Sequence, residues 1–344
     1  MLKWYEENGV NDDVVISSRV RLARNIARYH FSKKLTDDKA VALVEEVEKA
    51  FAHYSDETGQ YYVCKPGSLS ETERLAMVER HILSPAMNNK KQVTGLIMSE
   101  NESTTIMVNE EDHIRIQALA GGMNIEKAFL AANKLDDYAD ELLGFAFDEK
   151  YGYLTSCPTN VGTGLRASYM VFLPALGGAN KINRLSDEVA KYGITLRGIY
   201  GEGTNGLGNI YQISNQKTMG STEQEIINNL NSIVSQVIKQ ERKRREFLLT
   251  NNYDEIEDQV YRSYGVLKYT RQINSKDAMT LLAQIKFGVD TGIIKFTEDF
   301  HIYEMMMAIQ PYSLQCHNGK YAGSNVRDKL RAEYLNTNLP NILK

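Results

Sequence analysis

Five arginines lie in short segments whose residue types and spacing suit the binding of a phosphorylated ligand. In residues 17–21 (SSRVR), an extended chain would place Ser17, Arg19 and Arg21 on one face and turn Val20 toward a core. Two neighbouring guanidinium groups repel each other, so a strand keeps both where an anion lies between them. On a surface strand, acidic side chains between the two arginines would relieve this repulsion equally well. This segment alone leaves both explanations open.

A second segment, residues 109–117 (NEEDHIRIQ), combines carboxylates with an arginine. Polar side chains at 113, 115 and 117 alternate with isoleucines, which predicts a strand with Arg115 on its polar face. Three consecutive acids, at 110–112, lead into this strand. Taken by itself, the segment is equally typical of a solvated turn.

A third segment, residues 157–168 (CPTNVGTGLRAS), has the composition of a loop that can approach a ligand closely. We expect Arg166 at the start of a helix behind this loop, where backbone N–H groups and a helix N-terminus would suit an anion. An ordinary loop with a helix-ending glycine is the alternative. Cys157, beside a proline and near the expected helix end, is a candidate redox-sensitive thiol or else a packed small residue.

The fourth segment, residues 197–206 (RGIYGEGTNG), carries Arg197 and three glycines in the pattern G-x-G-x-x-G. A dinucleotide-binding fingerprint requires a helix after the glycines and an acid about 20 residues later. Here a strand-like run follows, at 209–212, so we reject that interpretation. The chain also contains no G-x-x-x-x-G-K-[ST] P-loop.

Considered together, the four segments predict a phosphate site made of arginines. Guanidinium groups keep their charge near neutral pH and bind phosphate oxygens in pairs. Five of them suit a nucleoside triphosphate and could neutralise charge on a transferring phosphoryl group without a P-loop.

The whole chain fits a two-domain protein without a net basic charge, which still allows a local basic cleft. It has 344 residues, with 40 Lys and Arg against 44 Asp and Glu and a net charge of −4, which argues against direct nucleic-acid or membrane binding. We find neither a signal peptide nor an apolar run of about 18 residues. Three scattered cysteines and six histidines without metal-ligand spacing indicate a reducing, cytoplasmic location and no metal site.

Hydrophobic patterns predict the elements that position these segments. A helix should begin after Thr36, and strands are expected at 61–64, 95–98, 105–108, 192–199 and 209–213. Thr222 and Glu225 form a capping box before a long helix, which we expect to end in a solvated charged run at 239–245. Ser275 should cap another helix that ends near Gly288. We place a boundary near residue 250, between an antiparallel α+β domain and a smaller helical domain.

In order along the chain, these motifs resemble the signature segments of the guanidino (phosphagen) kinase family, over residues 14–244. The resemblance implies a two-layer α/β catalytic domain at 14–250, in which helices flank an antiparallel sheet, after an N-terminal extension at 1–13. It implies that MgATP is held at Ser17, Ser18, Arg19, Val20, Arg21, His81, Arg115, Arg166, Ala167, Ser168, Tyr169, Met170, Arg197, Gly198, Ile199, Tyr200, Gly201 and Glu202. Glu111 would be the catalytic base, Glu202 would position the acceptor guanidinium, and Mg²⁺ would arrive with ATP.

Two departures point to the bacterial protein-arginine kinases within this family. The helical domain that precedes the first motif in small-molecule phosphagen kinases is not expected before Ser17, which would leave the acceptor site open. An extra helical region follows, at 251–344, and its residues 327–332 (RDKLRA) match the R-D-x-x-R-A motif of these kinases. The match implies that Arg327, Asp328, Arg331 and Ala332 bind phosphoarginine and regulate activity. Alternatively, Arg327 and Arg331 merely share a polar helix face.

The same resemblance implies partners that the residues themselves do not display. It implies a homodimer formed by the C-terminal helices, protein substrates with exposed arginines, and a role in the stress response. Inactivation of a CtsR-type repressor, marking of proteins for the ClpC–ClpP protease, and activation by the zinc-binding protein McsA belong to that role. We therefore favour a protein-arginine kinase. A kinase of free arginine or another small guanidino compound, and a non-catalytic phosphoarginine-binding adaptor, are the alternatives.

Overall fold

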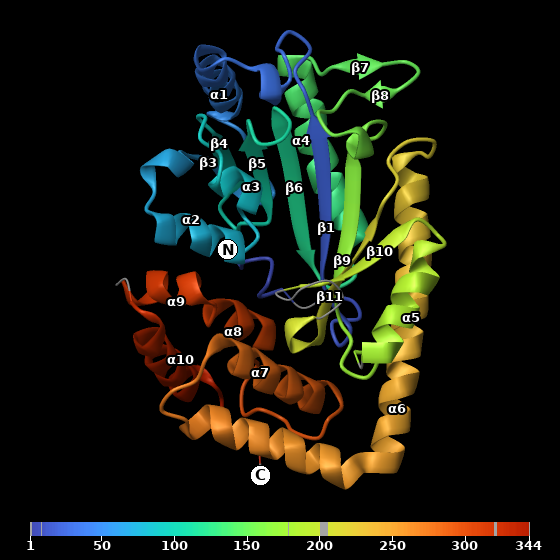
Figure 1. Cartoon of the computed structure of the whole chain (residues 1–344), viewed down its shortest axis with the longest axis vertical. Coiled ribbons are helices and arrows are strands. Elements are labelled where there is room, and N and C mark those ends of the chain that lie inside the picture. Colours follow the sequence, from blue (N-terminus) through green and yellow to red (C-terminus); the bar gives the residue numbers. More distant parts are fainter. Residues whose placement is uncertain (1, 8, 178, 200–205, 320–321, 344) are drawn as a thin grey trace.

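The computed structural model describes residues 2–7, 9–177, 179–199, 206–319 and 322–343, with the side chains of 179 and 180 left aside. Its centre is an antiparallel sheet in the order β10-β11-β9-β1-β6-β5-β4-β3-β2 (Figure 1). The strands are β1 (Val15–Arg24), β2 (Ser55–Asp56), β3 (Gly59–Cys64), β4 (Gly95–Ser99), β5 (Thr104–Val108), β6 (Ile114–Gly121), β9 (Leu165–Phe172), β10 (Ile194–Gly198) and β11 (Ile210–Asn215), and β7 (Phe147–Asp148) pairs separately with β8 (Gly152–Tyr153).

One face of this sheet is covered by helices, as amphipathic patterning requires. The covering helices are α1 (Asp37–Phe51), α4 (Ile125–Leu143), α5 (Ala179–Ala190) and the first half of α6 (Glu223–Tyr269). The helix predicted after Thr36 is present as α1, and its apolar stripe of Ala40, Val44, Val47 and Phe51 is buried against the sheet. Val20 and Leu22 of β1 point into the same core, so the period-two prediction for this strand is confirmed.

Most of the expected strands are present, and the one at 192–199 is shorter than predicted. β10 begins at Ile194 because α5 is followed by a turn in which Gly193 has a φ of +72°. The N–H groups of Tyr192 and Gly193 bond back to the carbonyls of Val189 and Ala190. A left-handed residue at this position ends the helix and delays the strand.

The long helix α6 continues past the charged run in which it was predicted to end, and it is kinked at Asn252, where it bends sharply toward the C-terminal helices (Figure 1). Its Thr222 capping box is present, and Asn252 has a non-helical φ of −138°, so two helical stretches meet at this residue and the second ends at Tyr269. Within the charged run, Glu241 and Arg245 are buried and paired at 2.8 Å, and Glu241 also accepts the backbone N–H groups of Ala175 and Leu176. Within the charged run, the buried positions of α6 are no longer apolar. They are occupied by the ion pair of Glu241 and Arg245.

The C-terminal helices pack against one end of the other sheet face. They are α7 (Ser275–Asp290), α8 (Ile302–Ala308), α9 (Pro311–Asn318) and α10 (Ser324–Asn338), and their core includes Met170 and Phe172 of β9. Asn274, not Ser275, is the N-cap of α7, because its side chain accepts the N–H of Asp277. None of the helices described combines the length and apolarity needed to cross a membrane.

Shorter helices complete the described chain: α2 (Glu71–Glu79), α3 (Pro85–Asn88), η1 (Ser32–Lys34), η2 (Pro66–Ser68), η3 (Pro158–Asn160) and η4 (Leu207–Asn209). The helix α2 lies beside α9, so it joins the edge of the sheet to the C-terminal helices (Figure 1). The sheet face that carries the arginines is thus bounded by α2 on one side and by the C-terminal helices below.

Candidate active site

Strand register brings the five predicted arginines to one face of the sheet. Arg21 of β1 lies directly opposite Arg166 of β9, and Arg115 of β6 pairs with Ala23, two residues along the same face of β1. Met170 of β9 pairs with Gln212 of β11, and Gln212 pairs with Arg197 of β10. Because residues paired across an antiparallel ladder share a face, Arg19, Arg21, Arg115, Arg166 and Arg197 all do so.

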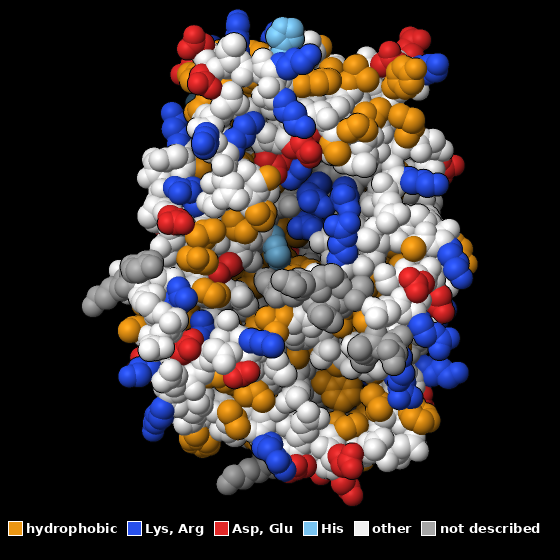
Figure 2. All heavy atoms as spheres, viewed as in Figure 1, with side chains coloured by type: hydrophobic (Ala, Val, Ile, Leu, Met, Phe, Trp, Pro, Cys, Tyr) orange, Lys and Arg blue, Asp and Glu red, His pale blue; other side chains and the backbone are white. Residues whose placement is uncertain are grey.

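This is the face against which the C-terminal helices pack at one end. The arginines lie on the part of it that these helices leave open. Arg19, Arg21, Arg115 and Arg166 are partly buried and Arg197 is exposed. Figure 2 shows Lys and Arg side chains gathered in a hollow at the middle of the molecule, with acidic groups at its upper rim. Arg19 Nη2 donates a 2.7 Å hydrogen bond to Gln212 Oε1 of β11, the second strand from β1.

Burial and mutual repulsion outweigh the nearby negative charge in the centre of this cluster. Burial, followed by Arg19, Arg115 and Arg166, holds the pKa of Arg21 well below its ordinary value. Burial and the charges of Arg197 and Arg115 likewise lower the pKa of Arg166. Among the described residues, no carboxylate lies within ion-pair distance of Arg21 or Arg166, and the Nε of each is buried without a hydrogen-bond partner. Such groups fit a bound polyanion.

Arg166 reaches the cluster from a strand, so the predicted helix start at this residue is wrong. Residues 165–172 form β9, and the only helical turn in the preceding loop is η3. The glycines serve chain packing rather than an anion nest. Gly164 has a φ of +64°, and a Cβ there would lie 2.6 Å from the carbonyl oxygen of Ala23. Cys157 contacts Thr159 Oγ1 at 3.0 Å in this loop.

The three acids before β6 have three different environments. Glu110 is buried and accepts Arg115 Nη1 at 2.7 Å. Asp112 is also buried and accepts the Nδ2 of Asn25 at 2.7 Å and the backbone N–H of Ser156 at 2.6 Å. Glu111 alone of the three is exposed, with its carboxylate 3.6 Å from Arg115 Nη2. The expected base therefore stands at the open edge of the arginine cluster.

The sequence did not reveal how the loop that carries Glu111 is held. Asn109 has a φ of +58°, and the Nζ of Lys90 donates to its side chain at 3.0 Å and to the carbonyl of Glu110 at 2.7 Å. The hydroxyl of Ser84 donates to Glu110 Oε1. Neither Lys90 nor Ser84 lies in one of the four segments singled out from the sequence. Only the run of three acids at 110–112 indicated that cations would lie near this loop.

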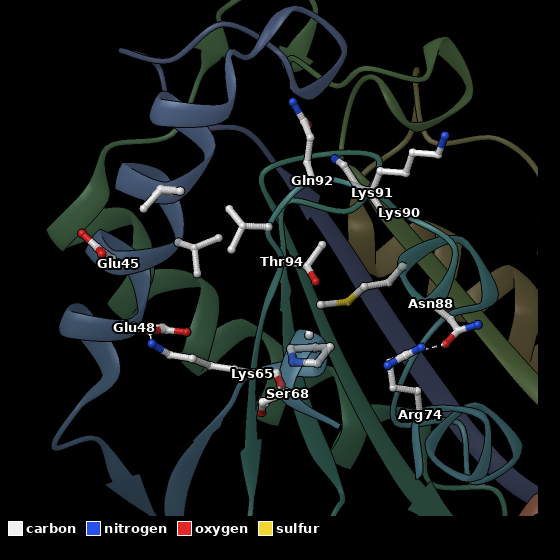
Figure 3. A pocket seen from close by; sticks show the side chains of 16 residues that line it. Glu45, Glu48, Lys65, Ser68, Arg74, Asn88, Lys90, Lys91, Gln92 and Thr94 are labelled. Carbon is white, nitrogen blue, oxygen red and sulfur yellow. Dashed lines mark hydrogen bonds and ion pairs between the residues drawn. The ribbon is translucent and has the colours of Figure 1, made fainter. Parts of the chain in front are cut away.

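A cavity of about 730 Å³ lies behind this loop, away from the arginine cluster. Figure 3 shows Lys90, Lys91 and Gln92 on one side of it and Glu45 and Glu48 on α1 opposite. Arg74, inside the cavity, already donates to Asn88 and to the carbonyl of Leu69. None of the five clustered arginines lines this space.

His81 lies beside the arginines, as the resemblance implies, just after α2. It has a φ of +63°, and its carbonyl accepts the Nε2 of Gln117, a residue on the arginine-bearing face, at 2.7 Å. Burial, with the charges of Arg19 and Arg21, lowers the pKa of His81 to about 3, so its ring is neutral. A left-handed conformation in a residue this bulky is unusual and is typical of functional sites.

The remaining ATP-binding candidates divide between the two faces of the sheet. Ser17, Ser168 and Met170 share the face of the arginines, and Met170 packs with the C-terminal helices. The side chains of Ser18, Val20, Ala167 and Tyr169 are buried on the opposite face and hold the strands in place instead. Gly198 ends β10, and Ile199 bonds through its N–H to Ile210. Tyr200, Gly201 and Glu202 lie outside the described residues.

The R-D-x-x-R-A motif lies on α10. Arg331 is 1% exposed, and its guanidinium donates to the carbonyls of Ile309 and Ile273, each at 2.9 Å, and to Asp328 Oδ1 at 2.6 Å. The alternative that Arg327 and Arg331 merely share a polar helix face is therefore wrong for Arg331, because tertiary packing buries its side chain. Arg327 and Asp328 are partly exposed, Ala332 is buried, and Asp328 lines a cavity of about 590 Å³.

Family models match both parts of the chain. Residues 42–244 match "ATP:guanido phosphotransferase, C-terminal catalytic domain", and residues 253–344 match "Protein-arginine kinase McsB C-terminal domain". The protein-arginine kinase of Halothermothrix orenii is 44% identical over 98% of this chain and 96% of its own. That of Bacillus subtilis is 42% identical over 98% of this chain and 93% of its own.

Solved structures share the fold. A lombricine kinase aligns with a TM-score of 0.61 and 23% identity, over 70% of this chain and 69% of its own. The duplicated taurocyamine kinase of Schistosoma mansoni, with bound transition-state analogue components, aligns with a TM-score of 0.61 and 21% identity, over 90% of this chain and 47% of its own. With a phosphagen-kinase sheet, an arginine-lined face and near full-length similarity to these relatives, the chain belongs to the protein-arginine kinase family of ATP-dependent guanidino phosphotransferases.

Proposed function

We propose that the protein transfers the γ-phosphoryl group of ATP to arginine side chains of proteins. The observation that carries this proposal is the convergence of five guanidinium groups on one open sheet face, with the exposed Glu111 at its edge. A triphosphate would supply the negative charge that the buried Nε atoms of Arg21 and Arg166 need.

The residues of the chain account for the chemistry of such a transfer. An arginine guanidinium is cationic and a poor nucleophile, so one nitrogen must be aligned with the γ-phosphorus and must lose a proton. As the N–P bond forms and the bond from phosphorus to the ADP oxygen breaks, Glu111 accepts that proton, and ADP leaves. General-base catalysis contributes roughly 10²–10⁴-fold. The arginines stabilise the transferring group, and Mg²⁺ carried by ATP supplies further charge neutralisation.

For Glu202 we keep the role that the family resemblance implies, the positioning of the acceptor guanidinium. We also propose that the motif on α10 forms a regulatory phosphoarginine pocket. Arg327 and Asp328 would contact the ligand beside the cavity at Asp328, while the buried Arg331 and Ala332 would hold the helix in place.

Several wider features of the family are proposals for this chain. They are a catalytic domain at 14–250 with a helical domain at 251–344, a homodimer, a cytoplasmic location, and activation by McsA. A CtsR-type repressor and substrates of the ClpC–ClpP protease are the proposed targets. The three cysteines form no disulfide, which is consistent with a reducing compartment, and Cys157 is half-buried in its loop.

Incubation with MgATP and an arginine-rich protein tests the proposed activity. We expect an acid-labile phosphoramidate, and phosphate found only on Ser, Thr or Tyr would contradict the proposal. Free L-arginine, offered in the same assay, should turn over slowly; rapid turnover would favour a small-molecule guanidino kinase. Glu111→Gln should lose most of the rate, whereas Glu45→Gln, an exposed glutamate on α1, should not. An adaptor would keep its function in both variants.

A further inference from the structure

Two parts of the chain that are distant in sequence meet at His81. On one side, its carbonyl oxygen is bound by Gln117 of the arginine-bearing face. On the other side, the hydroxyl of Tyr303, on α8, lies 3.4 Å from His81 Nε2. His81 therefore connects the candidate nucleotide site to the C-terminal helices, through its main chain on one side and its ring on the other, and the charges of Arg19 and Arg21 act on that ring.

Aromatic packing fixes this contact. Trp4 lies against both rings, with centroid distances of 6.5 Å to His81 and 6.1 Å to Tyr303. Trp4 is 1% exposed and Tyr303 is 7% exposed, so neither ring can rotate into solvent without disturbing the core. Trp4 is also the single tryptophan of the chain, which makes its fluorescence a direct probe of this junction.

A carboxylate two residues before His81 holds the same two units together. Glu79, the last residue of α2, accepts the backbone N–H groups of Tyr312 and Ser313 at 3.0 and 2.7 Å, and the hydroxyl of Ser313 at 2.8 Å. These groups form the N-terminus of α9, where the helix dipole favours a negative charge. The clamp at Glu79 sets the distance between α8 and His81.

We infer that Tyr303 is a positioning residue for nucleotide binding, which acts by orienting the His81 ring, and that Glu79 holds the C-terminal helices where Tyr303 can reach it. The inference rests on the proposed nucleotide site. The hydrogen bond couples the tautomer of the ring to this contact: when the Tyr303 hydroxyl donates to Nε2, the ring proton lies on Nδ1. Docking of the C-terminal helices then raises the affinity for nucleotide, and bound nucleotide favours docking by the same factor, because such coupling is reciprocal.

The low pKa of His81 is consistent with this arrangement, because only the neutral ring can accept a hydrogen bond at Nε2. The neutral ring also adds no further positive charge beside Arg19 and Arg21. Loss of the tyrosine hydroxyl would remove this hydrogen bond from the His81 ring while leaving the aromatic packing intact.

The test is the dissociation constant of MgATP, measured by calorimetry on the full chain without an acceptor. Tyr303→Phe should raise it about three- to ten-fold, the effect of one hydrogen bond. Glu79→Gln should raise it as well and should speed amide exchange at Tyr312 and Ser313. Tyr264→Phe is the matched control, because it removes a hydroxyl bonded to the Pro340 carbonyl at 3.1 Å within the same helices. It should leave the constant unchanged.

Trp4 emission gives a signature that a general loss of stability would not produce. MgATP should shift the emission of the unaltered protein, and Tyr303→Phe should alter the spectrum even before nucleotide is added. An unchanged dissociation constant in Tyr303→Phe, alongside weakened binding in Arg21→Ala, would overturn this inference alone. Unchanged binding in both variants would contradict the nucleotide site itself, and the inference with it.

Discussion

Arg21 and Arg166 on the sheet face and Arg331 on α10 are partly or wholly removed from water, yet their surroundings are opposite. Arg331 donates to Asp328 and to two main-chain carbonyls inside the protein, and none of its nitrogens is among the described buried atoms that lack a partner. Arg21 and Arg166 have buried Nε atoms without a partner among the described residues, and like charges as neighbours. A buried arginine with a full set of acceptors holds a fold together, whereas one that lacks them is placed there for a ligand.

The largest effect that this contrast predicts is a loss of stability in Arg331→Ala. The change leaves the carbonyls of Ile309 and Ile273 unbonded and Asp328 without its partner. Each buried acceptor left without its donor costs about 1–3 kcal/mol of unfolding free energy, and Asp328, which is partly exposed, adds less. Urea denaturation followed by circular dichroism measures it, and a loss below about 1 kcal/mol would contradict the structural role.

Arg21→Ala should show the opposite profile. Removal of one charge-stabilising donor lowers kcat/KM by about 10²–10³-fold. The melting temperature should not fall, because the variant relieves repulsion by Arg19, Arg115 and Arg166 together with the cost of burial. Initial rates with MgATP and a protein substrate, beside a thermal melt, separate the two effects. A variant that melts much earlier but keeps its rate would reverse the comparison.

His81, which lies beside the arginines of the sheet face, should make the stability of the protein depend on pH. Its pKa is about 3 in the folded protein against an ordinary value of 6.5, so the unfolded chain binds the extra proton between these pH values. This group therefore costs no stability above pH 6.5 and lowers stability progressively as the pH falls from about 6.5 to 3.

His81→Asn should reduce that dependence, and asparagine tolerates the left-handed backbone at this position. Thermal melts between pH 7 and pH 4 compare the variant with the unaltered protein. Parallel curves for the two proteins would show that His81 is not held neutral by its surroundings.

The smallest effect is expected for Arg327→Ala, four residues before Arg331. Arg327 is partly exposed, so its removal should change the unfolding free energy by no more than about 0.5 kcal/mol. If Arg327 contacts phosphoarginine, the same variant should lose the response of the kinase to added phosphoarginine. A thermal melt and an activity titration with phosphoarginine measure the two quantities separately.

Much of the candidate site could be predicted because period-two spacing is local. The alternation in residues 17–21 was enough to place Arg19 and Arg21 together and to send Val20 into the core. The loop around Gly164 was not predictable in this way. Its glycines are compatible with both a helix start and a tight turn. The choice of the turn depends on a contact distant in sequence, the close packing of Gly164 against the carbonyl oxygen of Ala23 on β1.

Residue types and spacing by themselves therefore determined the antiparallel α+β fold class, the family resemblance, the arginine-rich composition of the site and the long capped helix at 223. Tertiary structure alone decided that Glu110 and Asp112 are buried while Glu111 is open, that α6 continues through its charged run, and that Arg331 is a core residue. The physical reason is that spacing along a chain fixes the direction of a side chain. Its solvation and its partners depend on whatever other segment packs against it.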